Sequence, residues 1–310
     1  MSRPPHDLGR WTHHHRFAVG HAAAERGTRL VLWITLATML LEIVAGNWFN
    51  SMALLADGWH MSSHALAIGL SAFAYAAARR YASDPSFAFG TWKIEVLASY
   101  TSALFLLGVA GVMVYESLDR LWAPQTIRYQ EAIVVAVIGL VVNLACALIL
   151  GKAHDHEHAG HHHEDLNLKA AYIHVATDAA TSILAIIALA GGWFYGWNWL
   201  DPAIGLLGAG LVALWAKNLL KQSGRVLLDR EMDHPIVAEI REVIEQLPER
   251  GNTQLTDLHV WRVGTGAYAC ALSLLTHDTT LSPQQIREAL GIHDEIVHVT
   301  VEILHCDECD

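Results

Sequence analysis

The chain has 310 residues, of which 53% are hydrophobic and 16% charged, with a net charge of −11 when histidine is neutral. So apolar a composition argues against an ordinary soluble protein and favours a polytopic membrane protein. The acidic balance argues against nucleic acid as a partner, because the phosphate backbone is bound by clustered Lys and Arg. The 20 histidines are also unusual, since neutral imidazole is a common ligand for transition metals.

Residues 1–27 form a polar, histidine-containing tail. Asp7 and Glu25 lie within it and it has no apolar core, so it is not a signal peptide. Six apolar segments follow, each near the roughly 20 residues that cross a hydrocarbon core. They span about 29–49, 52–78, 95–118, 131–151, 170–195 and 199–220. The sequence therefore predicts a six-helix transmembrane domain over residues 28–221.

Basic residues indicate the orientation of this domain. They concentrate before the first segment, in the even-numbered connections and after the sixth segment: Arg26, Arg29, Arg79, Arg80, Lys93, Lys152, Lys169, Lys217, Lys221, Arg225 and Arg230. The opposite connections hold only Arg120 and Arg128. The positive-inside rule then predicts that both termini are cytoplasmic.

Ionisable side chains inside the segments indicate a site. Asp57, His60 and His64 lie in the second segment, and His174 and Asp178 in the fifth. A four-residue spacing places His60 with His64, and His174 with Asp178, on one helical face. Facing pairs would offer three imidazoles and one carboxylate, a tetrahedral set for a divalent transition metal.

The alternative is a network of interhelical hydrogen bonds without metal. Asp57 is ambiguous, because it either caps its helix or bonds a neighbouring one. Glu42 and Asn143 are interpreted as interior partners or proton-path residues rather than as ligands.

The connection 152–169 is histidine-rich. Its composition predicts a cytosolic loop that captures metal ions, with a flexible polar linker as the alternative. The candidate residues are His154, His156, His158, His161, His162 and His163.

From residue 222 to residue 310 the sequence is more polar, and its pattern predicts a small α+β cytosolic domain. Helical spacing spans Pro235 to Leu247, and a second short helix is expected from Ser282 to Leu290. Strands are expected over 254–263, 267–276 and 295–304. At the end of the chain, His305, Cys306, Asp307 and Cys309 form a candidate metal site, with a frayed tail as the alternative.

Two motifs carry a resemblance to a known family. Ser51-Met52-Ala53-Leu54-Leu55-Ala56-Asp57-Gly58-Trp59-His60-Met61 and the later His174-x-x-x-Asp178 closely resemble the cation diffusion facilitator family, over roughly residues 28–310. The resemblance implies a homodimeric metal/proton antiporter with a cytosolic metallochaperone-like domain. It further implies contact with membrane lipid and a location in the bacterial inner membrane. No cofactor is required; the transported ions would be Co²⁺, Ni²⁺ or Zn²⁺, and protons the counter-ion.

Three features together resemble the bacterial DmeF-type branch, associated with cobalt and nickel export. His64 stands where zinc exporters usually carry aspartate, the connection after the second segment contains Asp84-Pro85-Ser86-Phe87-Ala88-Phe89-Gly90-Thr91, and the loop 152–169 is histidine-rich. Some relatives have a further metal site between the second and third segments. Here Phe87 and Thr91 replace its histidines and leave only Asp84, so we expect this site to be absent.

Three alternatives remain open. The first is a zinc-preferring exporter of the same family, which would differ from a cobalt or nickel exporter only in which ion it prefers. A membrane-anchored metal sensor or buffer would use the histidine-rich loop, but would not need buried histidines in two segments. A membrane metalloenzyme would need a general base and an open coordination position, and the sequence contains no His-Glu-x-x-His motif.

Overall fold

The structure is a computed structural model that describes residues 25–154, 166–247 and 253–306, with only the backbone for 25–32, 63–68, 71–72, 146–154 and 166–178. By internal contacts the chain divides into two units. Among the described residues, one unit comprises 25–73, 98–154 and 166–221, and the other comprises 74–97, 222–247 and 253–306.

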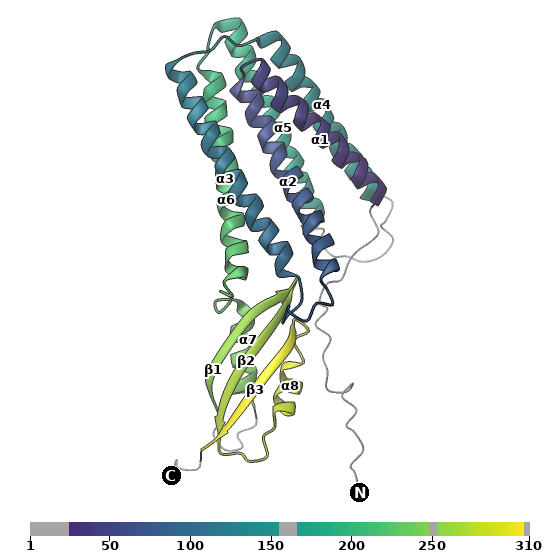
Figure 1. Cartoon of the computed structure of the whole chain (residues 1–310), viewed down its shortest axis with the longest axis vertical. Coiled ribbons are helices and arrows are strands. Elements are labelled where there is room, and N and C mark those ends of the chain that lie inside the picture. The colour runs from purple at the N-terminus through teal and green to yellow at the C-terminus, as the bar shows by residue number, and fades with distance from the viewer. Residues whose placement is uncertain (1–24, 155–165, 248–252, 307–310) are drawn as a thin grey trace. The chain divides into compact units, whose positions relative to one another are not determined.

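Six long helices cover the six predicted apolar segments, and Figure 1 shows them running alongside one another. They are α1 Glu25–Trp48, α2 Met52–Arg80, α3 Lys93–Trp122, α4 Tyr129–His154, α5 Leu166–Tyr195 and α6 Leu200–Leu227. Within the described residues, α3 and α6 are long and apolar enough to cross a membrane by themselves, while α1, α4 and α5 contain shorter apolar stretches. The helices are observed, and six crossings stay a prediction.

Three connections meet at one end of the bundle, which we call the distal end: 49–51, 123–128 and 196–199. The Asn50 side-chain amide donates to the Thr126 carbonyl at 3.3 Å. The Arg128 amide donates to the Phe49 carbonyl at 3.1 Å. The Tyr129 hydroxyl, at the start of α4, donates to the side-chain Oδ1 of Asn198 at 2.7 Å. These bonds bring all three connections together.

Small residues allow the helices to approach closely. One buried contact joins α1, α2, α4 and α5 through Ala45, Leu54, Ala132, Ala136 and Leu189. Another joins α3 to α6 through Leu106, Ala110, Val212 and Ala216. On α6, a Cβ at Gly208 would lie 2.7 Å from the Ala56 Cβ, and one at Gly205 would lie 2.8 Å from the Met52 Cβ. The first turns of α2 therefore lie directly against α6.

The C-terminal domain has two layers, a three-stranded sheet and two helices on one of its faces (Figure 1). Its elements are α7 Pro235–Glu245, β1 Gln254–Gly264, β2 Ala267–Thr276, α8 Pro283–Leu290 and β3 Ile296–His305. β1 pairs antiparallel with β2, and β2 pairs parallel with β3 across the α8 connection. The predicted order of helices and strands is confirmed, with bounds differing by a residue or two.

Apolar side chains alternate along the strands and so gather on one face of the sheet, where they form the core of this domain. One face of the sheet, with Leu258, Val260, Cys270, Leu272 and Leu274, packs against apolar residues of both helices. A capping box at Ser282 begins α8, because the Ser282 amide donates to the Gln285 side chain and its hydroxyl accepts from the Gln285 amide.

The connection between α2 and α3 belongs to the same unit as this domain. Phe89 packs edge-on against Trp261 of β1 and His298 of β3, with ring centroids 5.3 and 5.5 Å apart. The Lys93 ammonium lies 2.6 Å from the Asp229 carboxylate. The start of α3 is thus joined to the segment that follows α6.

Candidate metal-transport site

His60 is the described member of the predicted four-ligand set. It lies in α2, only 2% exposed, and its ring is 4.9 Å from the Trp215 ring of α6. A buried ionisable side chain in a membrane helix costs on the order of 2.5–3.5 kcal/mol by insertion scales, so such residues face the bundle interior and usually have a function.

Asp57 lies on α2, three residues before His60, and its side chain joins α2 to α5. Its carboxylate, 2% exposed, accepts hydrogen bonds from the Thr181 hydroxyl at 2.8 Å and the Ser182 hydroxyl at 2.6 Å. Of the two readings of Asp57, the bond to a neighbouring helix is confirmed. A cap is wrong, because α2 begins at Met52, five residues earlier.

This pair of bonds sets the register between the two helices. Asp57 is about one turn before His60, while Thr181 is about one turn after Asp178. Two antiparallel helices held at Asp57 and Thr181 therefore bring positions 60 and 178 to similar depth. A small cavity lies beside this contact, lined by Ala53, Ala56, Asp57, His60, Thr181, Leu184, Ile204, Leu207 and Gly208.

The other three predicted ligands lie on the expected helices. His64 is on α2, and His174 and Asp178 are on α5. Their side chains lie outside the described part of the structure, so the four-ligand set stays a prediction.

The first turn of α2 is held from α6 by Asp201, which is 1% exposed. Its carboxylate accepts from the Ser51 hydroxyl at 2.7 Å and from the backbone amides of Met52 and Ala53 at 2.7 and 3.1 Å. A carboxylate suits this position, because the first amides of a helix lack intrahelical acceptors and carry partial positive charge. Arg120 donates to the Asn50 carbonyl at 2.5 Å just before this turn.

Glu42 and Asn143 are both buried in the bundle, in agreement with their interpretation as interior residues. The Asn143 amide contacts the Met61 sulfur at 3.9 Å, which joins α4 to α2. Glu42 projects from α1 toward Gly58 and Gly139.

The remaining predicted metal residues are only partly described. His154 ends α4, and the rest of the loop histidines lie outside the described residues, as do Asp307 and Cys309. His305 ends β3, and Cys306 is disulfide-bonded. Since a metal binds the thiolate, the predicted C-terminal site would require the reduced form of Cys306.

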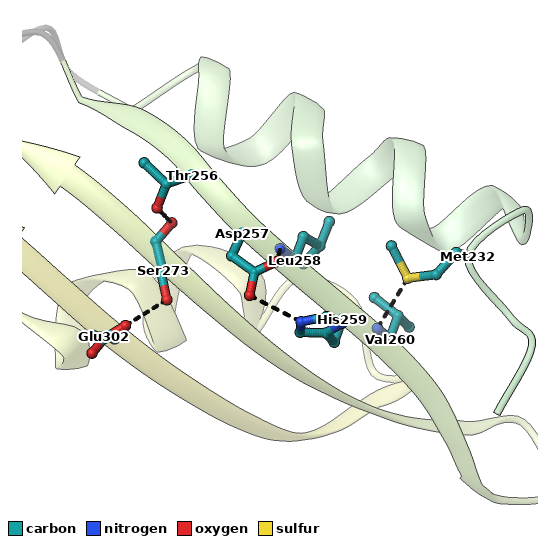
Figure 2. A network of polar contacts seen from close by, with 8 residues as sticks. All are labelled: Met232, Thr256, Asp257, Leu258, His259, Val260, Ser273 and Glu302. Carbon is teal, nitrogen blue, oxygen red and sulfur yellow. Dashed lines mark hydrogen bonds and ion pairs between the residues drawn. The ribbon is translucent and has the colours of Figure 1, made fainter.

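Figure 2 shows polar side chains from all three strands of the sheet. The Asp257 carboxylate lies 2.9 Å from His259 Nε2, and the Ser273 hydroxyl donates to Glu302 at 2.7 Å. Among the residues that the structure describes, no three His, Cys, Asp or Glu side chains gather closely enough to hold a metal ion.

Asp84 forms a local turn in the connection between α2 and α3. It accepts hydrogen bonds from the Ser86 amide, at 2.9 Å, and from the Ser86 hydroxyl. Both bonds lower the pKa of the Asp84 carboxyl, and the bond from the Ser86 hydroxyl has the larger effect. Nearby, Thr91 donates to the Ala78 carbonyl at 2.8 Å, and Phe87 packs near Tyr81.

Sequence reasoning missed several residues that position the site: Ser51, Thr181, Ser182, Asp201 and Trp215. Asp201 carried one usable signal, an acidic residue followed by Pro202 at the start of an apolar segment. The others are ordinary residues of apolar helices, and only their partners distinguish them.

Long apolar helices that enclose a histidine and carboxylate side chains are typical of membrane proteins that transport ions. The comparisons with known proteins agree. The cation efflux transmembrane domain matches residues 28–228, and this chain belongs to the cation diffusion facilitator family.

Similar proteins cover nearly the whole chain. The metal cation efflux system protein CzcD of Cupriavidus metallidurans is 32% identical over 92% of this chain and 89% of its own length. The cadmium, cobalt and zinc/H(+)-K(+) antiporter of Bacillus subtilis is 29% identical over 92% of each chain. The zinc transporter ZitB of Yersinia pestis is 30% identical over 89% of this chain and 87% of its own length.

Proposed function

We propose that this protein exports a divalent transition metal ion from the bacterial cytosol in exchange for protons. The ion binds His60, His64, His174 and Asp178. The observation that carries the proposal is the buried contact of Asp57 with Thr181 and Ser182 beside the buried His60. This contact brings positions 60 and 178 to similar depth, and this shared depth supports the proposed ligand set.

Proton coupling follows from the ligand chemistry. An imidazole binds metal only when neutral, so metal and protons compete for the same nitrogens. Protons would displace the metal when the site opens outward, and would be released when it opens to the cytosol. In support, one similar protein is named a cadmium, cobalt and zinc/H(+)-K(+) antiporter.

Cobalt and nickel are the proposed cargo, as in the DmeF-type branch, with zinc as the alternative. Three imidazoles and one carboxylate favour cobalt, nickel or zinc over manganese or magnesium, which prefer oxygen ligands. The names of similar proteins include cobalt, zinc and cadmium. His64→Asp is expected to shift the ranking toward zinc, and an unchanged ranking would contradict this role of His64.

The proposed arrangement is a homodimer with six spans per chain, both termini cytoplasmic, joined through the C-terminal domain and the helices. The loop containing residues 154–163 collects ions for the site. Deleting these residues is expected to weaken apparent affinity while leaving transport. Loss of all metal binding would instead favour a sensor or buffer.

The principal experiment measures Co²⁺, Ni²⁺ and Zn²⁺ uptake into proteoliposomes with an imposed proton gradient. Wild type is compared with His60→Ala, His174→Ala and the control His277→Ala, an exposed histidine of the C-terminal domain. Uptake that vanishes in the first two and persists in the control supports the proposal. Undiminished uptake in His60→Ala and His174→Ala would overturn the site. Absence of uptake in the wild type would overturn the function.

A further inference from the structure

Glu42 is a buried carboxyl group that the proposed metal site does not use. It lies in α1 within the apolar stretch Met39–Ala45, and it is 0% exposed. A charged group at this depth carries the same kind of energetic cost as the buried His60. A purely structural residue at this position would be expected to be apolar or to carry a neutral amide.

The neighbouring helices make room for this carboxyl group in particular. A Cβ placed on Gly139 of α4 would lie 1.8 Å from Glu42 Oε1, and the next two nearest atoms, Cδ at 3.0 Å and Cγ at 3.9 Å, also belong to the Glu42 side chain. A Cβ on Gly58 of α2 would lie 3.1 Å from the Glu42 Cβ and 2.9 Å from Cγ1 of Ile43. Gly139 therefore serves the carboxyl group rather than a close contact of two backbones.

The position of Glu42 relates it to the site through α2. Gly58, which faces Glu42, directly follows Asp57, whose carboxylate faces α5. Glu42 of α1 thus packs against the turn of α2 that carries Asp57, on a different face of that helix and about one turn from His60. A change in α2 that alters the surroundings of His60 also alters those of Glu42.

Few other titratable groups can share this role. On α2 the neighbouring ones are Asp57 and His60, and on α4 the sequence contains none between Glu131 and Cys146. On α1, no other titratable side chain follows Arg29 within the helix. Glu42 is therefore the only carboxyl group that α1 and α4 contribute to the middle of the bundle.

We propose that Glu42 is a proton-binding residue of the exchange, an inference that rests on the proposed antiport. Its carboxylate takes up one proton, forming an O–H bond, in the outward-open state. It returns that proton as H⁺ to the cytosolic side when metal next binds, and no electrons are transferred. A neutral carboxylic acid can be enclosed by apolar helices at far lower cost than a carboxylate. Protonation thus permits the return of the empty protein.

The test compares two assays on the same proteoliposomes. One measures Zn²⁺ or Co²⁺ uptake driven by a pH gradient; the other measures exchange of labelled for unlabelled metal with no pH gradient. Exchange needs metal binding and movement of the loaded protein but no return of the empty one. Glu42→Gln preserves shape and removes titration. Because the amide is always neutral, the empty Glu42→Gln protein returns without taking up a proton at this position, so the pH gradient drives uptake less. Gradient-driven uptake is expected to fall about tenfold or more, while metal exchange stays within about twofold.

Control variants separate a proton role from a packing role. Glu131→Gln, at an exposed position of α4, is expected to behave as wild type. Glu42→Asp keeps a titratable group and is expected to restore part of the driven uptake, with a shifted pH profile. This variant also tests the proposal if Glu42→Gln does not fold.

Three outcomes would overturn the role of Glu42. These are driven uptake by Glu42→Gln within about twofold of wild type, equal loss of both assays in a folded Glu42→Gln protein, and no difference between Glu42→Asp and Glu42→Gln. Failure of the proposed function appears differently, as a wild-type protein that shows metal exchange but no response to a pH gradient.

Discussion

Replacing Asp201 by alanine should strongly destabilise the bundle, because its carboxylate is the acceptor for the start of α2. The backbone amides of Met52 and Ala53 are almost fully enclosed and bond this carboxylate. Without it both amides lose their partner, at about 1–3 kcal/mol each. The buried Ser51 hydroxyl loses its acceptor as well. We expect Asp201→Ala to lower the free energy of unfolding by about 3–5 kcal/mol.

Asp201→Asn gives an intermediate result in the same experiment. The amide keeps one oxygen acceptor and loses the negative charge that interacts with the helix N-terminus, so we expect a loss of about 1–2 kcal/mol. The control is Asp119→Ala, an exposed carboxylate in α3, expected to change stability by less than about 0.5 kcal/mol.

The assay is unfolding of the purified full-length protein in mixed micelles by increasing SDS, followed by tryptophan fluorescence. The expected order of stability is wild type with Asp119→Ala, then Asp201→Asn, then Asp201→Ala. The reasoning would be refuted if Asp201→Ala lay within about 1 kcal/mol of Asp119→Ala. The carboxylate would then not be the acceptor that the first turn of α2 depends on.

Three further predictions concern packing, capping and pH. Gly208→Ala should lower the free energy of unfolding by about 1–3 kcal/mol in the same assay, because the added Cβ would lie 2.7 Å from the Ala56 Cβ. The control Gly210→Ala should be neutral or slightly stabilising, because a Cβ there meets no atom within 4 Å. Ser282→Ala should destabilise the C-terminal domain by about 1 kcal/mol through loss of the α8 capping box, and Ser282→Asp should retain most of that stability; hydrogen exchange of α8 amides would show both. Burial raises the pKa of the Cys270 thiol to about 11, from an ordinary value of 9.0, so the folded domain holds this proton more tightly than the unfolded chain. Its contribution to stability is complete below pH 9 and falls by up to about 3 kcal/mol as the pH rises to 11; a pH-dependent loss in Cys270→Val equal to that of wild type would contradict this account.

Much of the fold was predictable from local pattern. Six apolar segments coincide with α1 to α6, and the alternation of residues 254–276 and 295–304 coincides with the three strands. Such patterns involve residues close in the chain, whose periodicity reflects one buried face. The His60–His64 and His174–Asp178 spacings belong to the same class of local evidence, which places each pair on one helical face.

Partners between helices were not predictable in this way. Asp57 could be interpreted either as a cap or as a partner of another helix, and the structure pairs it with Thr181 and Ser182. Asp201 received no role from the sequence, yet it holds a helix that begins 149 residues earlier. Their roles depend on which faces meet after folding.

The sequence by itself determined that this chain forms long apolar helices, carries the spaced pairs His60–His64 and His174–Asp178 within them and ends in a small α+β domain. Only the tertiary structure decided that Asp57 joins α2 to α5, that Asp201 begins α2 and that Glu42 fills the space left by Gly139. Secondary structure follows the local periodicity of apolar side chains. The choice of partner for a buried polar group depends on helix register and close packing, which arise among segments far apart in the chain.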